Sequence, residues 1–137
     1  MIVADTGAVL ALLDSDERHH EVLRQRFEDD GGAWVLPWAI LPEVDYLAAT
    51  RLGLEVERAF LRDLAEGAFA VEWGNEQDLA RAQELDQRHR ALKLGLVDSV
   101  VIAVAERVRA EAIVTLDVRH FGAVAIRGEP KLWPRDL

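Results

Sequence analysis

The chain has 137 residues, of which half are hydrophobic and 30% are charged, as in ordinary water-soluble globular proteins. It has no cysteine, which excludes disulfide bonds and thiolate metal sites. Its formal net charge of -9 disfavours nucleic-acid binding, unless metal ions or a local basic patch offset it. The apolar N-terminal stretch follows no basic region and ends at Asp14, so it fits neither a signal peptide nor a membrane span. We therefore expect a cytoplasmic protein with no membrane segment and one domain over residues 1–137.

Short apolar runs alternate with helical patterns along the whole chain. In chain order, they predict a strand at 2–5, helices at 6–13 and 17–27 (the latter capped by Asp16), a strand at 34–36, helices at 39–52 and 55–66, a strand at 69–72, helices at 76–92 and 97–107, and strands at 113–114 and 124–126. The tail "GEPKLWPRDL" has no periodic pattern and is expected to lie along the surface. Apolar strands separated by helices indicate a parallel sheet with helices on both faces.

Four carboxylates occupy unusual places in this pattern. Asp5 ends the first strand, and Glu43 lies in the first turn of the helix at 39–52. Asp98 is the only charge before Glu106 in an otherwise apolar helix, and Asp117 follows the fourth strand. Each has an ordinary alternative role: Asp5 and Asp98 as helix N-caps, Glu43 as a first-turn acid, and Asp117 as a turn residue.

Taken together, the four acids favour a ligand site. In a parallel sheet of this kind these positions meet at the carboxyl ends of the strands, where ligands bind. Two carboxylates about 5 Å apart repel by about 3 kcal/mol at an effective dielectric of about 20, and a divalent cation reverses the sign of that energy. Mg²⁺ prefers such hard oxygen ligands. The hydroxyls of Thr6, Ser99 and Thr115 are candidates to orient waters or carboxylates.

Four segments resemble the acidic motifs of PIN-domain ribonucleases, in particular the VapC toxins of bacterial toxin–antitoxin pairs: "IVADTGAVLALL", "LPEVDYLAATRLG", "LGLVDSVVIAVAER" and "IVTLDVRHF". The resemblance runs from residue 2 to about residue 126. It implies a three-layer α/β/α sandwich with a parallel sheet of about five strands, and cleavage of RNA that depends on Mg²⁺ or Mn²⁺. It also implies inhibition by a VapB-like antitoxin, and commonly a homodimer.

The resemblance assigns the acidic quartet to Asp5, Glu43, Asp98 and Asp117, with Asp5 and Asp98 as the metal ligands. A carboxylate-held cation activates water and polarises a phosphodiester. The basic residues Arg88, Arg90, Lys93 and Arg119 are candidates for RNA contact, although such runs are usually a solvated helix face. The histidines show no metal-ligand spacing, so structural or surface roles are expected for His19, His20, His89 and His120, with phosphate contact a lesser alternative for His120.

Two other function classes remain as alternatives. A receiver-like signalling domain is also a small parallel α/β protein, but it would need a second acid beside Asp5 and a lysine after the last strand, whereas Lys131 lies in the tail. A PIN fold that has lost catalysis could serve as a binding module, and the complete quartet argues against this.

Overall fold

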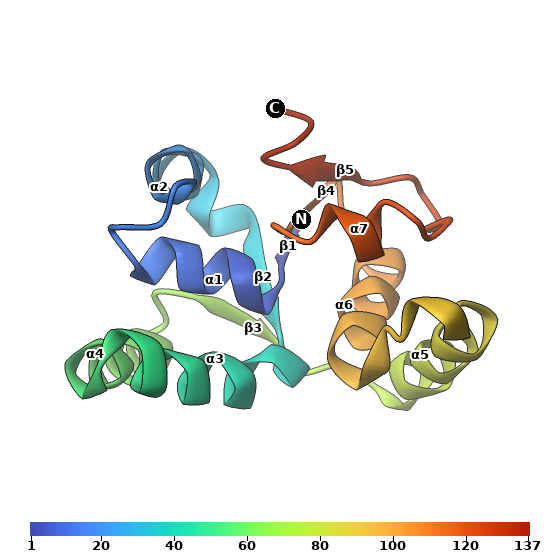
Figure 1. The fold of residues 1–137 in the computed structure, drawn as a ribbon, viewed down its shortest axis with the longest axis horizontal. Coiled ribbons are helices and arrows are strands. Elements are labelled where there is room, and N and C mark those ends of the chain that lie inside the picture. The colour runs from blue at the N-terminus through green and yellow to red at the C-terminus, as the bar shows by residue number, and fades with distance from the viewer.

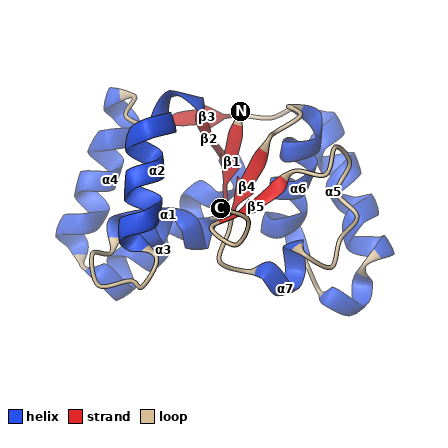
Figure 2. Cartoon of the chain, turned by 90° about the horizontal axis from the view of Figure 1, so that it is seen from above, coloured by secondary structure: helices blue, strands red, loops and turns tan.

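A five-stranded parallel sheet forms the centre of the protein (Figures 1 and 2). The computed structural model describes residues 1–30 and 32–137 in full, and Gly31 by its backbone alone. In the order β3-β2-β1-β4-β5, the strands are Ala70–Glu72, Trp34–Pro37, Ile2–Ala4, Ala112–Val114 and Lys131–Trp133. Ile2 lies opposite both Trp34 and Ala112, so the first strand is central and joins the two halves of the chain.

The helices cover both faces of the sheet. On one side lie α1 (Thr6–Leu13), α2 (His20–Asp30), α3 (Leu41–Leu47) and α4 (Leu54–Glu66); on the other lie α5 (Glu76–Arg88) and α6 (Gly95–Arg107), and α7 (Val118–Phe121) follows β4 (Figures 1 and 2). Short 3-10 turns span Gly31–Ala33, Trp38–Ile40 and Arg90–Leu92, and a π turn, Ala48–Leu52, continues α3. The expected three-layer α/β/α fold is therefore confirmed.

The apolar helix predicted at 97–107 is the centre of one helical layer. α6 packs on α5 and touches β1 and β2, and every residue from Ser99 to Ala105 is buried. A helix covered on most sides needs apolar residues around its whole circumference, which explains the composition of this segment.

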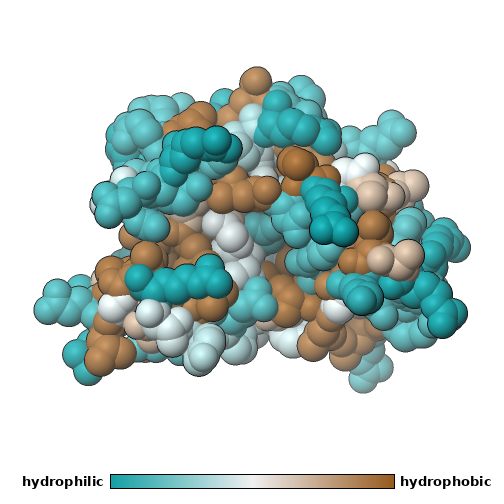
Figure 3. Space-filling view, in the orientation of Figure 1, coloured by the Kyte–Doolittle hydropathy of each residue, from teal (hydrophilic) through white to brown (hydrophobic). Residues whose placement is uncertain are grey.

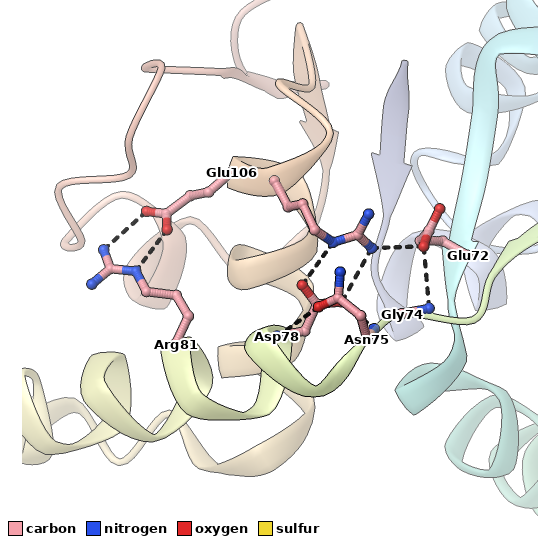
Figure 4. Close-up of polar contacts among 7 residues, drawn as sticks. Glu72, Gly74, Asn75, Asp78, Arg81 and Glu106 are labelled. Carbon is pink, nitrogen blue, oxygen red and sulfur yellow. Dashed lines mark hydrogen bonds and ion pairs between the residues drawn. The ribbon is translucent and has the colours of Figure 1, made fainter.

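An ion-pair network fixes the C-terminal end of α6 (Figure 4). The Arg107 guanidinium donates to Asp78 of α5 (Nε to Oδ1, 2.8 Å) and to Glu72 of β3 (Nη2 to Oε1, 2.6 Å). One residue earlier, Glu106 accepts from Arg81 of α5 (Nε to Oε1, 2.7 Å). Asp78 also forms a capping box with Asn75 at the start of α5. α5, α6 and the edge strand β3 are thus held in register by charge-assisted hydrogen bonds.

The fifth strand is not the predicted one. Residues 124–126 lie in a loop, although the side chains of Val124 and Ile126 are buried. The tail provides the strand instead: Lys131–Trp133 pairs with β4, and Leu132 and Trp133 are buried. The expectation that the tail only lies along the surface is therefore wrong for Leu132 and Trp133, while most of its other residues are exposed. Residues 131–133 pair with the backbone of β4, whereas residues 124–126 form no strand.

The second helix begins later than predicted, at His20, and Asp16 does not cap it. Residues 14–19 form a turn held by side chain to backbone hydrogen bonds, in which Asp14 accepts from the Asp16 amide (3.0 Å) and Glu17 accepts from the His19 amide. Such local bonds compete with helix formation. Within the described residues, no helix combines the length and apolar character that crossing a membrane requires.

Candidate active site

The acidic residues gather where β1 and β4 end. Asp5 directly follows β1, and Asp117 follows β4, its neighbour in the sheet. Asp98 approaches from α6 and Glu43 from the first turn of α3. The surface is hollowed between α1 and α3 on one side and α6 and α7 on the other (Figure 3). The polypeptide thus brings acids from four segments to one edge of the sheet.

Asp5 is both a helix cap and a member of this group. It is only 5% exposed, and its Oδ1 accepts from the Ala8 amide (2.9 Å), which caps α1. Burial raises the pKa of Asp5 from 3.8 to about 7, against the opposing hydrogen bonds from Thr115 and Ala8. The charges of Asp98 and Asp117 raise this pKa further. The capping alternative for Asp5 is therefore correct. At the same time, burial and the neighbouring acids make the ionised form of this carboxylate unfavourable.

Asp98 is not a helix cap. α6 begins at Gly95, whose amide donates to Asp86 (3.0 Å), so Asp98 lies in the fourth position of the helix. Burial raises the pKa of Asp98, a hydrogen bond from His120 lowers it, and the charges of Asp117 and Glu43 raise it. Because its capping alternative is excluded, the half-buried carboxylate of Asp98 has another reason to be there, and its contact with His120 is the partner that the structure gives it.

Asp117, Asp98 and His120 form the tightest part of the cluster. His120 Nδ1 lies 2.9 Å from Asp98 Oδ2 and 3.2 Å from Asp117 Oδ2. Asp117 caps the short helix α7, because its Oδ1 accepts from the His120 amide (3.1 Å). One ligand atom from each of these three residues lies within 4.8 Å of the others. This set of oxygen and nitrogen atoms is compact enough to surround a metal ion.

Glu43 lies at the edge of the cluster. It is exposed on the third residue of α3, after the turn that follows β2. It influences the pKa of Asp98 through its charge. The dipole of α3 favours an acid at this position, so its ordinary role as a first-turn acid and its place near Asp98 are compatible.

The three hydroxyls are placed differently. Thr115 is fully buried; it donates to Asp5, and its Oγ1 accepts from the Asp117 amide (2.9 Å), so it links two of the acids. Thr6 and Ser99 are buried, and neither hydroxyl has a hydrogen-bond partner among the described residues. Ser99 lines a crevice between α5 and α6 beside Asp86. Support of the acids by a hydroxyl is thus seen for Thr115.

The basic candidates are all exposed. Arg88 ends α5, Arg90 lies in the turn after it, and Lys93 precedes α6. Arg119 lies on α7 between Asp117 and His120. Their role in RNA contact remains a prediction.

His120 was underestimated from the sequence. A structural or surface role was expected, yet its ring lies between two of the acids. A signal was available: His120 comes three residues after Asp117, and residues spaced by three share one face of a helix. The helix α7 is only four residues long, so the periodicity that reveals longer helices was absent.

Comparisons with known proteins agree with this geometry. Residues 2–126 match the PIN domain family. The chain is 32% identical over 123 residues to Ribonuclease VapC26 of Mycobacterium tuberculosis (strain ATCC 25618 / H37Rv), covering 90% of this chain and 91% of that protein. Among solved structures, M. tuberculosis VapC20, a Sarcin-Ricin loop cleaving toxin, superposes with a TM-score of 0.81 at 19% identity, covering 93% of this chain and 98% of that one. The DNA-bound VapBC of Salmonella typhimurium gives 0.72 at 20% identity, covering 96% and 95%. The chain therefore belongs to the PIN domain family, among the VapC-type ribonucleases.

Proposed function

We propose that this protein is a metal-dependent endoribonuclease and the toxin of a type II toxin–antitoxin pair. The observation that carries the proposal is the convergence of Asp5, Asp98 and Asp117 at the ends of β1 and β4. The 32% identity to a protein named as a ribonuclease supports RNA as the substrate class.

The acids fit Mg²⁺ or Mn²⁺. Burial and mutual repulsion raise the pKa values of Asp5 and Asp98, so their charged forms are costly without a counter-ion. Carboxylate oxygens are the ligands that these hard cations prefer. When bound, the ion supplies an activated water and an electrophile for the phosphodiester.

The residues divide the remaining work. Asp5 and Asp98 hold the cation in this proposal, because Asp5 is buried, Asp98 is half-buried, and they approach from different elements. Thr115 positions Asp5 and Asp117 through its two hydrogen bonds. Glu43 and Asp117 are the more exposed acids, and they are suited to orient the attacking water, to accept its proton or to add a further ligand to the cation.

RNA must approach a protein with a net charge of -9. The local positive charge that the phosphate backbone requires is offered by exposed cations at and after the end of α5 and on α7, namely Arg88, Arg90, Lys93 and Arg119. We expect the protein to act in the cytoplasm, where its RNA substrate would be.

Partners follow from the same family. Solved relatives include VapBC complexes, and we propose a VapB-like antitoxin that covers the acids. A homodimer is proposed on the same resemblance.

The test is RNA cleavage by Asp98→Asn, with and without Mg²⁺. Because Asp98 is not a cap, this change should leave the fold intact. It should lower the rate of RNA cleavage by orders of magnitude and reduce the rise in melting temperature on adding Mg²⁺. Asp29→Asn, which changes an exposed acid on α2, is the matched control and should behave as the wild type. Full activity of Asp98→Asn would refute the site. A wild-type protein that binds RNA but never cleaves it would instead favour the inactive binding module.

A further inference from the structure

A histidine nitrogen lies at the most compact point of the acidic cluster. The two distances from His120 Nδ1, 2.9 Å to Asp98 Oδ2 and 3.2 Å to Asp117 Oδ2, join it to acids from two different elements. Its side chain is 23% exposed, so the ring is largely enclosed while it faces the acids. The described histidines otherwise lie apart from this cluster: His19 contacts Glu17, and His20 contacts the Ala11 carbonyl.

The position of the ring is fixed by its own helix. The His120 amide donates to Asp117 Oδ1 (3.1 Å), and the next residue, Phe121, is buried at 1% exposure. The cap and the buried phenyl ring hold α7, and the imidazole projects beside Asp98 as a result. Orientation of this kind, set before any ligand arrives, is what a binding site requires.

The spacing of His120 Nδ1, Asp98 Oδ2 and Asp117 Oδ2 would allow all three atoms to bind one metal ion. Neighbouring ligands of an octahedral ion bound at about 2.1 Å lie about 3.0 Å apart, close to the 2.9 Å and 3.2 Å seen here. The same distances suit a ring N–H that donates to the two carboxylates, so the contact has two interpretations that an experiment can separate.

We propose that His120 Nδ1 is a direct ligand of the divalent cation, beside Asp98 and Asp117, and that it shifts the preference of the site from Mg²⁺ toward first-row transition ions such as Mn²⁺. This inference rests on the proposed metal site and deepens it. Carboxylate and water ligands suit Mg²⁺, whereas an imidazole nitrogen suits transition ions. Coordination uses the lone pair of Nδ1, so in the bound form the ring proton is carried on Nε2.

The test uses Mn²⁺ as the probe, in the purified full-length protein without RNA. Electron spin-echo modulation of bound Mn²⁺ detects a directly coordinated ¹⁴N nucleus. The wild type should give this signal, and His120→Ala should lose it. His89→Ala, which removes a histidine at the end of α5, is the matched control and should keep it.

Calorimetric titrations of Mn²⁺ and Mg²⁺ supply the second measurement. Loss of a ligand should weaken Mn²⁺ binding by about 10–100-fold, as even outer-shell changes do, while Mg²⁺ binding changes less. The ratio of the two affinities should therefore fall by about tenfold in His120→Ala and stay unchanged in His89→Ala.

Two results would overturn the inference in distinguishable ways. Wild-type protein that binds Mn²⁺ without the ¹⁴N signal, with an unchanged affinity ratio in His120→Ala, would leave the ring as a hydrogen-bond donor and the metal site intact. Wild-type protein that binds neither ion would remove both the inference and the proposed metal dependence. If His120→Ala fails to fold, the wild-type spectrum alone still decides whether nitrogen is bound.

Discussion

Replacing Asp5 with Asn should stabilise the metal-free protein at alkaline pH and leave it nearly unchanged in acid. The pKa of Asp5 is raised from 3.8 to about 7 in the folded chain, chiefly by burial. The folded state therefore holds a proton that the unfolded state has already lost. Stability falls as pH rises from 3.8 to about 7, and it stays at the lower level above that.

The size of the effect follows from that pKa. A pKa difference of one corresponds to about 1.4 kcal/mol, so full ionisation of Asp5 lowers the free energy of unfolding by about 4 kcal/mol. About 2–3 kcal/mol of this is lost between pH 5 and pH 8. Asn caps helices as well as Asp does, so Asp5→Asn should keep the bond from the Ala8 amide and escape the loss.

The assay is urea unfolding of both proteins in chelator from pH 5 to pH 8. Asp98 is present in both, so the difference between the two pH profiles isolates Asp5. Between pH 5 and pH 8, the free energy of unfolding of the variant should rise by about 2–3 kcal/mol relative to that of the wild type. Saturating Mg²⁺ should reduce this difference, because it stabilises the wild type more strongly than the variant. Parallel profiles for the two proteins in chelator would refute the reasoning.

Further predictions concern the scaffold, the substrate and the partner. Arg107→Ala leaves Asp78 buried at 2% exposure without its ion pair, so urea unfolding should show a loss of about 2–3 kcal/mol, discounted for the partial exposure of Arg107, with RNA cleavage retained; an unchanged midpoint would contradict it. Arg90→Ala should weaken RNA binding and reduce the slope of log affinity against log salt by about one; an unchanged slope excludes a phosphate contact there. An antitoxin should place an Arg or Lys beside Asp98, so its replacement by Ala should weaken the complex at least about tenfold in calorimetry. A complex that leaves Asp98 open to solvent would count against this.

The fold was largely predictable because its signals are local. Apolar runs mark the buried strands, and Thr6–Leu13 begins and ends where the pattern predicts. The strand at Lys131–Trp133 was missed because its three residues are flanked by prolines and begin with an exposed lysine. What makes it a strand is the open edge of β4, which is a property of the tertiary structure and absent from the local sequence.

The site was predictable in its residues but not in its arrangement. The acids stood out because charge is costly inside a sheet protein. Whether Asp98 caps a helix could not be decided, since the start of α6 depends on Gly95 and on its bond to Asp86. The contact of His120 with Asp98 joins residues far apart in the chain, so no local pattern predicts it.

The pairing of β1 with β4 determines when the acidic cluster forms during synthesis and folding. Asp5 is synthesised long before its neighbours in the sheet, because Ile2 lies opposite Ala112, and β4 in turn pairs with β5, Lys131–Trp133. Contacts between such distant segments form late in folding, after a long loop has closed. A chain in which β4 has not yet been made, or from which it has been removed, therefore carries Asp5, Glu43 and Asp98 without assembling the acidic cluster. On the proposed function, RNA cleavage therefore begins only after residues 112–133 have been synthesised and have joined the sheet.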